Sequence, residues 1–428
     1  MKIDYEKASF KDFENIPGLN AFERAGAFND YLNFLDEKGH LNYRLLNASA
    51  CGPQLDILTS KASKPQRYVS FVSNDYLGFT QHPEIKRAMI QGIERFGSGA
   101  GASPAIGGHF EFHQALENKI AAFFHRKSAI LYTTGYTANS ATFQSLLQKE
   151  DIAILDMAVH ASIYEGCQLT NVKTFLHNNL EMLERILIDA QMKYRTKMVI
   201  IDGVYSQDGD LAPLDQILKL CRQYGAFLAV DDAHGTGVIG STGRGLIEHY
   251  NLFDQIDIIT GTFSKTFANI GGYVVADPEL IRFLKFQSKQ HLFSVTATPA
   301  ATLGTIRAME ILDEEPIWME KLWENILYFR TGLVQMGLDV GTTQSAIIPV
   351  KIGSPEVTGE VGRLLLDAGV YANPIIYPAV NRKNARIRMS VMATHTTEQL
   401  DLALNVFNDI RKKLPITKEN IRPGRYGR

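Results

Sequence analysis

The chain has 428 residues, of which 45% are hydrophobic and 21% charged, a composition typical of folded globular domains and unlike that of disordered chains. Its 44 basic and 46 acidic side chains give a net charge of −2, which excludes bulk electrostatic attraction to nucleic acid or to an anionic membrane. Three cysteines without CxxC spacing exclude a disulfide framework and a zinc knuckle, and no metal site is expected.

The ends and the longest uncharged stretches indicate a cytoplasmic protein. The N-terminal residues mix charges of both signs where a signal peptide would be apolar. The uncharged stretches carry Thr, Asn, Gln and Gly, so none predicts a membrane span. A chain of this length is long enough to form two or three domains.

Residues 1–66 predict a helical arm. In segment 20–39, apolar and aromatic residues recur at helical spacing and stop at Gly39. No strong strand signal accompanies them. We expect the arm to pack on the main body or on a partner subunit.

Residues 67–310 predict a large α/β domain. Short apolar runs, each followed by a helical pattern, occur at 129–132, 152–155, 198–201, 227–230 and 256–259. Runs that are apolar on both faces are typical of a parallel sheet covered by helices.

Residues 311–428 predict a small α+β domain that ends in a basic tail. Strand candidates lie at 346–352, 370–376 and 385–392, with a helix at 359–369. A terminal helix begins with a capping box formed by Thr396 and Gln399.

Lys265 follows the last strand of the large domain within the run Gly261-Thr-Phe-Ser-Lys265. Open α/β sheets bind ligands at the carboxyl ends of their strands. A partly desolvated lysine there has a lowered pKa and forms imines, and Thr262 and Ser264 can donate to a phosphate. A surface lysine in a polar turn is an equally good interpretation of this motif alone.

Asp231 and His234 favour an imine-forming lysine over a surface lysine, because they follow the neighbouring strand candidate. A pyridoxal-type cofactor needs an acid at its ring nitrogen, so that the ring accepts electrons. Asp231 suits that role, and His234 can bond the ring oxygen. Helix capping is the alternative role for Asp231.

Two weaker motifs complete a candidate cofactor site. Residues 133–137 (Thr-Thr-Gly-Tyr-Thr) join a strand to a helix and are suited to bind a phosphate at the helix N-terminus. His160 follows another strand and can stack on a flat ring, although a lone histidine is more often structural. The run 97–101 (Gly-Ser-Gly-Ala-Gly) follows a helical pattern and precedes Pro104, so a dinucleotide site is disfavoured.

Taken together, these motifs resemble the α-oxoamine synthases, which are pyridoxal 5'-phosphate (PLP) enzymes, and look most like serine palmitoyltransferase. Matching segments run from about residue 42 to 411 and include 73–78, 205–210, 231–240, 262–265 and 388–395. The resemblance implies fold-type I: a large domain with a mostly parallel seven-stranded sheet, plus a small C-terminal α+β domain. It also implies a homodimer with shared active sites.

The resemblance implies a role for each matching residue. Lys265 would carry the cofactor, Asp231 would pair with its ring nitrogen and His160 would stack on the ring. His234 and Ser206 would contact the ring oxygen, and the phosphate would be bound by Gly135, Tyr136, Thr262, Ser264 and, from the partner subunit, Thr296. The substrate contacts would come from Asn74, Arg388, Arg44 and His109.

The implied reaction is decarboxylative condensation of a small amino acid with a long-chain acyl thioester, carried by coenzyme A or acyl carrier protein. It would make a sphingolipid or sulfonolipid base, and peripheral membrane contact is a further expectation. Pro104 and His109 depart from the family pattern, which leaves serine, cysteate, glycine and alanine open as substrates. An aminotransferase or decarboxylase is the more distant alternative.

Overall fold

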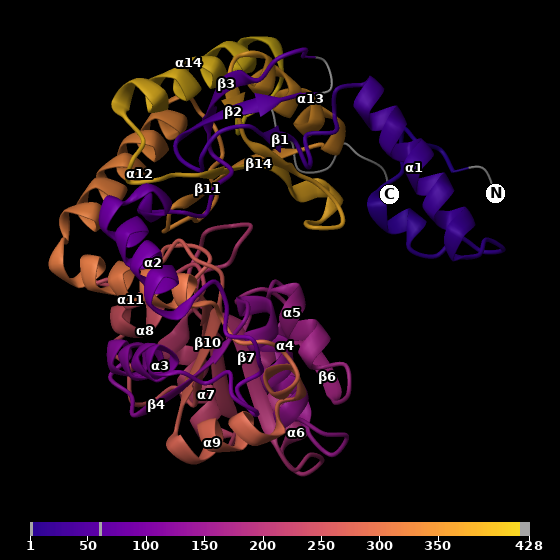
Figure 1. The fold of residues 1–428 in the computed structure, drawn as a ribbon. Coiled ribbons are helices and arrows are strands. Elements are labelled where there is room, and N and C mark those ends of the chain that lie inside the picture. The colour runs from indigo at the N-terminus through magenta and orange to yellow at the C-terminus, as the bar shows by residue number, and fades with distance from the viewer. Residues whose placement is uncertain (1–2, 60–61, 420–428) are drawn as a thin grey trace. The chain divides into compact units, whose positions relative to one another are not determined.

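The computed structural model describes residues 3–59 and 62–419, which form two compact units (Figure 1). Unit 1 combines residues 1–73 with 323–428, and unit 2 is formed by residues 74–322. This division differs from the three parts expected from the sequence, because the N-terminal and C-terminal segments share one unit. Most of the expected basic tail, residues 420–428, lies outside the described residues.

Unit 2 is built on a seven-stranded, mostly parallel sheet, which confirms the expected fold class (Figure 1). The strand order is β4-β10-β9-β8-β7-β5-β6, and only β10 runs antiparallel to its neighbours. The strands are β4 (Ser128–Tyr132), β5 (Ile152–Asp156), β6 (Asn171–Phe175), β7 (Lys197–Asp202), β8 (Phe227–Asp231), β9 (Ile258–Thr262) and β10 (Gly272–Ala276).

The five strands expected from apolar runs are all present, and β9 begins two residues later than expected and includes Gly261 and Thr262. Every residue of β5, β9 and β10 is buried, as a sheet covered on both faces requires. The apolar-run criterion missed two strands. β6 is an edge strand whose first four residues are exposed, and β10 begins with Gly272.

Helices cover the sheet and complete its core. Residues of α4, α5 and α9 pack in one buried cluster with strand residues such as Ile130, Ala153 and Ile200. The helices of unit 2 are α2 (Pro83–Phe96), α3 (Glu111–Phe123), α4 (Gly135–Leu146), α5 (Ala161–Gly166), α6 (Leu180–Ala190), α7 (Leu214–Gln223), α8 (Gly245–His249), α9 (Pro278–Gln287), α10 (Lys289–Leu292) and α11 (Pro299–Glu314). The run at 97–101 follows α2 rather than a strand, as its pattern indicated.

Unit 1 contains two small sheets, ordered β1-β2-β3-β12 and β11-β14-β13. Their strands are β1 (Leu46–Asn47), β2 (Gln54–Leu58), β3 (Gln66–Ser70), β11 (Ile347–Gly353), β12 (Val370–Tyr371), β13 (Asn373–Ile375) and β14 (Ala385–Ser390). The expected strand at 370–376 is divided, because β12 pairs with β3 and β13 pairs with β14.

The helical arm expected at 1–66 also contains strands, because it includes β1, β2 and the first residue of β3. In β2 the buried side chains alternate, and Leu55 and Ile57 pack against Tyr68 and Tyr371. This alternation spans only five residues, which is too short to stand out in a polar segment. The expected helix in segment 20–39 is confirmed as α1 (Ala21–Glu37).

The helices of the C-terminal part are α12 (Ile317–Gln335), α13 (Pro355–Asp367) and α14 (Thr397–Lys413). The capping box of α14 is present: Thr396 N–H donates to Gln399 Oε1 at 3.1 Å, and Gln399 N–H donates to Thr396 Oγ1 at 3.4 Å. Among the described residues, no helix has both the length and the apolar character needed to cross a membrane.

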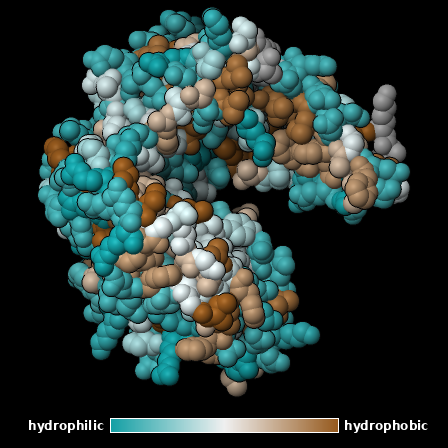
Figure 2. Space-filling model, in the orientation of Figure 1, coloured by the Kyte–Doolittle hydropathy of each residue, from teal (hydrophilic) through white to brown (hydrophobic). Residues whose placement is uncertain are grey.

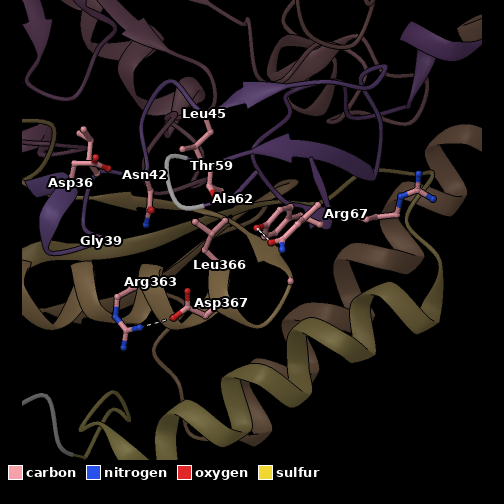
Figure 3. Close-up of a pocket in the computed structure, with 14 residues that line it drawn as sticks. Asp36, Gly39, Asn42, Leu45, Thr59, Ala62, Arg67, Arg363, Leu366 and Asp367 are labelled. Atoms are coloured by element: carbon pink, nitrogen blue, oxygen red, sulfur yellow. Dashed lines mark hydrogen bonds and ion pairs between the residues drawn. The ribbon is translucent and has the colours of Figure 1, made fainter. Parts of the chain in front are cut away.

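A cavity of about 590 Å³ lies within unit 1, between the segment after α1, the β2–β3 hairpin and α13 (Figure 3). Its lining carries charges of both signs, including Asp36, Arg67, Arg363 and Asp367. Arg67 and Arg363 already form ion pairs with neighbouring carboxylates. None of the residues expected to act in chemistry lines this cavity.

Candidate functional site

A second cavity, of about 260 Å³, lies in unit 2 at the carboxyl ends of strands β4, β8 and β9. Ligands of open α/β sheets bind at this edge. Its lining includes seven of the expected cofactor residues, namely Gly135, Tyr136, His160, Asp231, Thr262, Ser264 and Lys265. It also includes Thr134 and Gly261, which belong to the motifs at 133–137 and 261–265 but were given no role, and four residues that were not predicted: Asn139, Ala233, Ile270 and Gly271.

Lys265 lies on a tight turn directly after β9. Phe263 and Phe267, which are almost fully buried, anchor the turn on either side of the lysine. The turn closes through a hydrogen bond from Ala268 N–H to the Lys265 carbonyl at 2.9 Å. Ala268 has a φ of +59°, a strained conformation for a residue with a side chain. The amine of Lys265 is therefore presented by a rigid segment.

The N-terminus of α4 approaches the end of β9 so closely that glycine is required there. A Cβ atom on Gly135 would lie 2.6 Å from Thr262 Cβ. A Cβ atom on Gly272 would lie 2.4 Å from the Thr134 carbonyl oxygen. Thr262 Oγ1 donates to the Gly271 carbonyl at 2.9 Å and lies 2.7 Å from Ser264 Oγ. Helix N–H groups and two hydroxyls thus converge on one place, as an anion site requires.

Asp231 is the buried acid of the cavity, with an exposed fraction of 7%. Both of its carboxylate oxygens accept hydrogen bonds. Asn139 Nδ2 donates to Oδ2 at 2.6 Å, and Ala233 N–H donates to Oδ1 at 3.0 Å. The carboxylate is held in one orientation where it faces the cavity, as pairing with a protonated ring nitrogen requires.

His160 contributes its ring to the same lining and lies 5.9 Å from the Tyr136 ring, between centroids. Partial burial lowers the pKa of His160, and this effect is opposed by the charge of Asp231. The backbone N–H of His160 donates to Asp202 Oδ1 at 3.3 Å. Burial, and then repulsion by Asp231, raise the pKa of Asp202 well above its usual range.

His234 is buried beside the cavity but does not line it. Its Nδ1 lies 2.6 Å from the hydroxyl of Tyr76. The same hydroxyl donates to Asn74 Oδ1 at 3.4 Å. The structure therefore brings together His234 and Asn74 through Tyr76, which the sequence analysis named only as part of the segment 73–78.

Asp232, the neighbour of Asp231, explains three glycines that pack against its side chain. Cβ atoms on Gly203, Gly235 and Gly245 would all lie within 2.4 Å of its carboxylate oxygens. Asp232 Oδ2 accepts from Leu246 N–H at 2.8 Å. Burial raises the pKa of Asp232 to about 7. This carboxyl group belongs to the support of the site rather than to its lining.

Ser206 lies in a turn that His177 holds in place. His177 Nε2 lies 2.9 Å from Asp210 Oδ2, and Nδ1 lies 3.2 Å from Asp156 Oδ1, at the end of β5. The ring also meets that of Tyr205 edge-on, with centroids 4.3 Å apart. Burial works to lower the pKa of His177, but the hydrogen bonds to both carboxylates raise it to about 10. Ser206 itself does not line the cavity.

Thr296 and His109 lie outside the cavity lining of their own chain. Thr296 N–H donates to the Ala102 carbonyl at 3.4 Å, and its side chain lines a small separate pocket with Pro104. His109 is exposed, and its ring centroid is 6.2 Å from that of His113.

The two arginines expected to bind substrate belong to unit 1. Arg388 lies on β14, is 7% exposed, and donates to Ser390 Oγ at 2.8 Å. Arg44 is exposed and has a φ of +58°, a conformation uncommon for a residue with a side chain. Their roles stay predictions.

The unit 2 cavity fits PLP on the chemistry of its lining. An amine, a buried carboxylate and a flat imidazole line one space with a helix N-terminus and two hydroxyls. Lys265 would bind the aldehyde, Asp231 would bind the ring nitrogen, and the N-terminus of α4 with Thr262 and Ser264 would bind the phosphate.

The sequence of the chain matches one protein family. The model of the family described as aminotransferase class I and II matches residues 66–407. An 8-amino-7-oxononanoate synthase of Thermoanaerobacter pseudethanolicus is 43% identical over 350 residues, which cover 81% of this chain and 89% of that protein. Another, of Bacillus subtilis strain 168, is 40% identical over 353 residues, or 82% and 90% of the two chains.

The fold is similar to that of solved serine palmitoyltransferases. The enzyme from S. paucimobilis, with a bound adduct of PLP and myriocin, has a TM-score of 0.87 at 29% identity and covers 92% of this chain and 99% of its own. The enzyme from Sphingomonas wittichii has a TM-score of 0.86 at 29% identity, with 93% and 99% covered.

We expect the substitution His177→Gln to destabilise the protein at neutral pH by about 1–3 kcal/mol, because it removes hydrogen bonds to two carboxylates from a charged ring. The pKa of His177 is raised from 6.5 to about 10 in the folded state. The extra stability of the wild type over His177→Gln is therefore full below pH 6.5 and is lost as the pH rises toward 10. Urea unfolding at several pH values measures this. The exposed His249→Gln is the control, and an advantage independent of pH would contradict the prediction.

Proposed function

The chain belongs to the α-oxoamine synthases, a PLP-dependent group of acyltransferases within the class I and II aminotransferase family, and from this premise we propose that it condenses a small amino acid with an acyl thioester. One observation carries the proposal: Lys265, Asp231 and His160 line a single cavity at the carboxyl edge of the sheet. The reaction releases carbon dioxide and a free thiol and leaves an amino ketone.

PLP, when bound, supplies an electron sink that makes the α-hydrogen of an amino acid acidic. Asp231, fixed by Asn139 and Ala233, keeps the ring nitrogen protonated and so maintains that sink. His160 covers the ring. Thr262, Ser264 and the N-terminus of α4 hold the phosphate and so fix the position of the ring.

Lys265 has two tasks. It would hold the cofactor between turnovers, and its amine, once free, would serve as the base that acts on the substrate. The amine then accepts the proton from the α-carbon and later returns a proton to the product. The rigid turn around Lys265 would hold its nitrogen in one position, which favours one stereochemical course.

Arg388 would bind the substrate carboxylate as a bidentate pair. Such a pair would fix the orientation of the α-carbon at the cofactor, and therefore which of its bonds breaks first. The α-carbon, having given up its proton to Lys265, would attack the thioester carbonyl. A carbon–carbon bond forms, the thiolate leaves, and the resulting β-keto acid then loses carbon dioxide.

The substrate pair follows either of two patterns. Similarity of fold to serine palmitoyltransferase supports a long-chain acyl thioester with serine, or cysteate as a variant, for a sphingolipid or sulfonolipid base. The 43% identity to an 8-amino-7-oxononanoate synthase supports another pair. The product in that name carries its amine on a carbon with a methyl group, so it corresponds to alanine and a seven-carbon dioic acyl thioester.

A homodimer with shared sites is part of the proposal. Large apolar side chains are exposed on the chain, as Figure 2 shows for one face. Three of them lie in the segments around Thr296 and Pro104: Ile106 is 82% exposed, Phe293 84% and Val295 56%. Such side chains are typical of an interface that a second copy covers. Thr296 would then reach the phosphate of the partner.

We expect Lys265→Ala to abolish the visible absorbance of the bound cofactor and to lower amino-acid-dependent thiol release by more than about 100-fold, because the amine both holds the cofactor and moves the proton. Absorbance spectroscopy and a thiol-release assay measure the two effects. The exposed Lys219→Ala on α7 is the control. A Lys265→Ala protein that still makes amino ketone would refute the assignment.

Thiol release across serine, cysteate, glycine and alanine decides the substrate pair. Each amino acid is tested with a long-chain acyl thioester and with a seven-carbon dioic one, on coenzyme A and on acyl carrier protein. We expect release with one amino acid to exceed release with the others by at least about tenfold, the discrimination that a methylene-sized difference allows. Amino-group transfer without thiol release would instead indicate an aminotransferase.

We expect Thr296→Val to weaken PLP binding about tenfold or more, although Thr296 lies outside the cavity lining of its own chain, because a hydrogen bond to a charged phosphate is lost. Fluorescence titration measures the affinity, and sedimentation measures the dimer. Ser294→Ala, in the same segment, is the control. Unchanged affinity or a monomeric wild type would contradict shared sites.

A further inference from the structure

A buried hydrogen-bond network at the wall of the cavity connects Asp231 to His160. Its connecting members are Asn139 on α4 and Ser162 on α5, which are 3% and 0% exposed. Asn139 Nδ2 donates to Asp231 Oδ2 at 2.6 Å and to Ser162 Oγ at 3.0 Å. Ser162 Oγ lies 2.7 Å from His160 Nδ1. The network thus joins the two side chains that the proposed function places on the cofactor ring.

The chemistry of Asp231 fixes the direction of the Asn139 amide. An ionised carboxylate only accepts hydrogen bonds, so the NH₂ group of Asn139 must face it. The amide oxygen then points the other way, where Thr260 Oγ1 donates to it at 2.6 Å. All hydrogen-bonding groups of the Asn139 side chain are therefore engaged, and a flipped amide would place an oxygen against the carboxylate.

The direction of the Asn139 amide in turn fixes the hydroxyl of Ser162. Because the amide donates its second hydrogen to Ser162 Oγ, that oxygen acts as an acceptor toward Asn139, and its own hydrogen is free to donate to His160 Nδ1. The backbone N–H of Ser162 also donates to Nδ1, at 3.3 Å. His160 Nδ1 thus meets two donors.

From this order of donors and acceptors, we propose that Asn139 is a positioning residue that holds His160 as a neutral imidazole with its proton on Nε2. A proton on Nδ1 would meet the backbone N–H of Ser162, which donates to that nitrogen, and would displace the Ser162 hydroxyl hydrogen that the Asn139 amide leaves directed at it. The network therefore couples the ionised state of Asp231 to the tautomer of His160.

This coupling has a consequence for the cofactor. Asp231, which would keep the ring nitrogen of the cofactor protonated, would also select an uncharged imidazole at His160, which would stack on that ring. A neutral imidazole stacks on a cationic pyridine ring without repulsion between like charges. The lowered pKa of His160 agrees with a neutral ring. The inference rests on the proposed function for the identity of the cofactor ring. The tautomer of His160 does not depend on the proposed function.

Nitrogen NMR of protein labelled at histidine tests the tautomer directly. The chain has 11 histidines, and comparison with His160→Asn identifies the signals of His160. We expect wild-type His160 at neutral pH to show a protonated Nε2 and an unprotonated Nδ1, both without added cofactor and with it. A proton on Nδ1, or on both nitrogens, would overturn the proposal.

Two variants test the network. Asn139→Leu keeps the approximate volume of the side chain and removes its donors, and Ser162→Ala removes only the hydroxyl. We expect both to populate the Nδ1-protonated form of His160. We expect Asn139→Leu also to weaken PLP binding about 10- to 100-fold, as the loss of a hydrogen bond to a charged group does. Ser162→Ala stands in if Asn139→Leu fails to fold.

Thr142→Val is the matched control, because Thr142 is a buried polar residue one turn further along α4. We expect it to leave the tautomer and the PLP affinity unchanged. Variants that keep the wild-type tautomer and affinity would refute the role of Asn139. If the wild-type tautomer is as expected but no thiol is released with any substrate, the proposed function fails and the network stands.

Discussion

The charge of Asp231, held almost entirely out of water, sets the requirements for most of the residues around the cavity. An unpaired carboxylate in such a place costs several kcal/mol, so each oxygen needs a donor in a fixed position. Ala233 N–H and Asn139 Nδ2 are these donors. Asn139 needs partners of its own, which ties α4 to Thr260 on β9 and to Ser162 on α5. One buried charge thus orders side chains on three further elements.

Close backbone approach is the second requirement, and it concerns the phosphate end of the cavity. The N-terminus of α4 can aim its N–H groups at an anion only if it lies against the ends of β9 and β10. At that distance Gly135 and Gly272 have no room for a Cβ atom. The strain in the turn after Lys265, at Ala268, is located at the same edge of the sheet. Rigidity at both ends leaves a flat ring little freedom between them.

Much of unit 2 could be predicted from the sequence, because its strands are buried on both faces and appear as apolar runs. Edge strand β6 was missed, since four of its five residues are exposed, and β2 was missed because its alternation is short. Seven expected residues line one cavity because each ends or closely follows a strand of the same sheet. Asn139 and Ser162 carry no such signal. Both are polar residues inside helices, and only burial distinguishes them from solvent-facing ones.

By itself, the sequence determined the parallel sheet, the edge at which the cavity lies and the lysine, acid and imidazole that line it, because these depend on local periodicity and on residue type at the end of a strand. Tertiary structure decided what no local pattern contains. It placed Asn139 against Asp231, 92 residues away, and Tyr76 against His234, 158 residues away. It also left Thr296 outside the cavity of its own chain. Hydrogen bonds between distant segments require that donor and acceptor atoms be placed to within a few tenths of an ångström, and only the packed fold sets these positions.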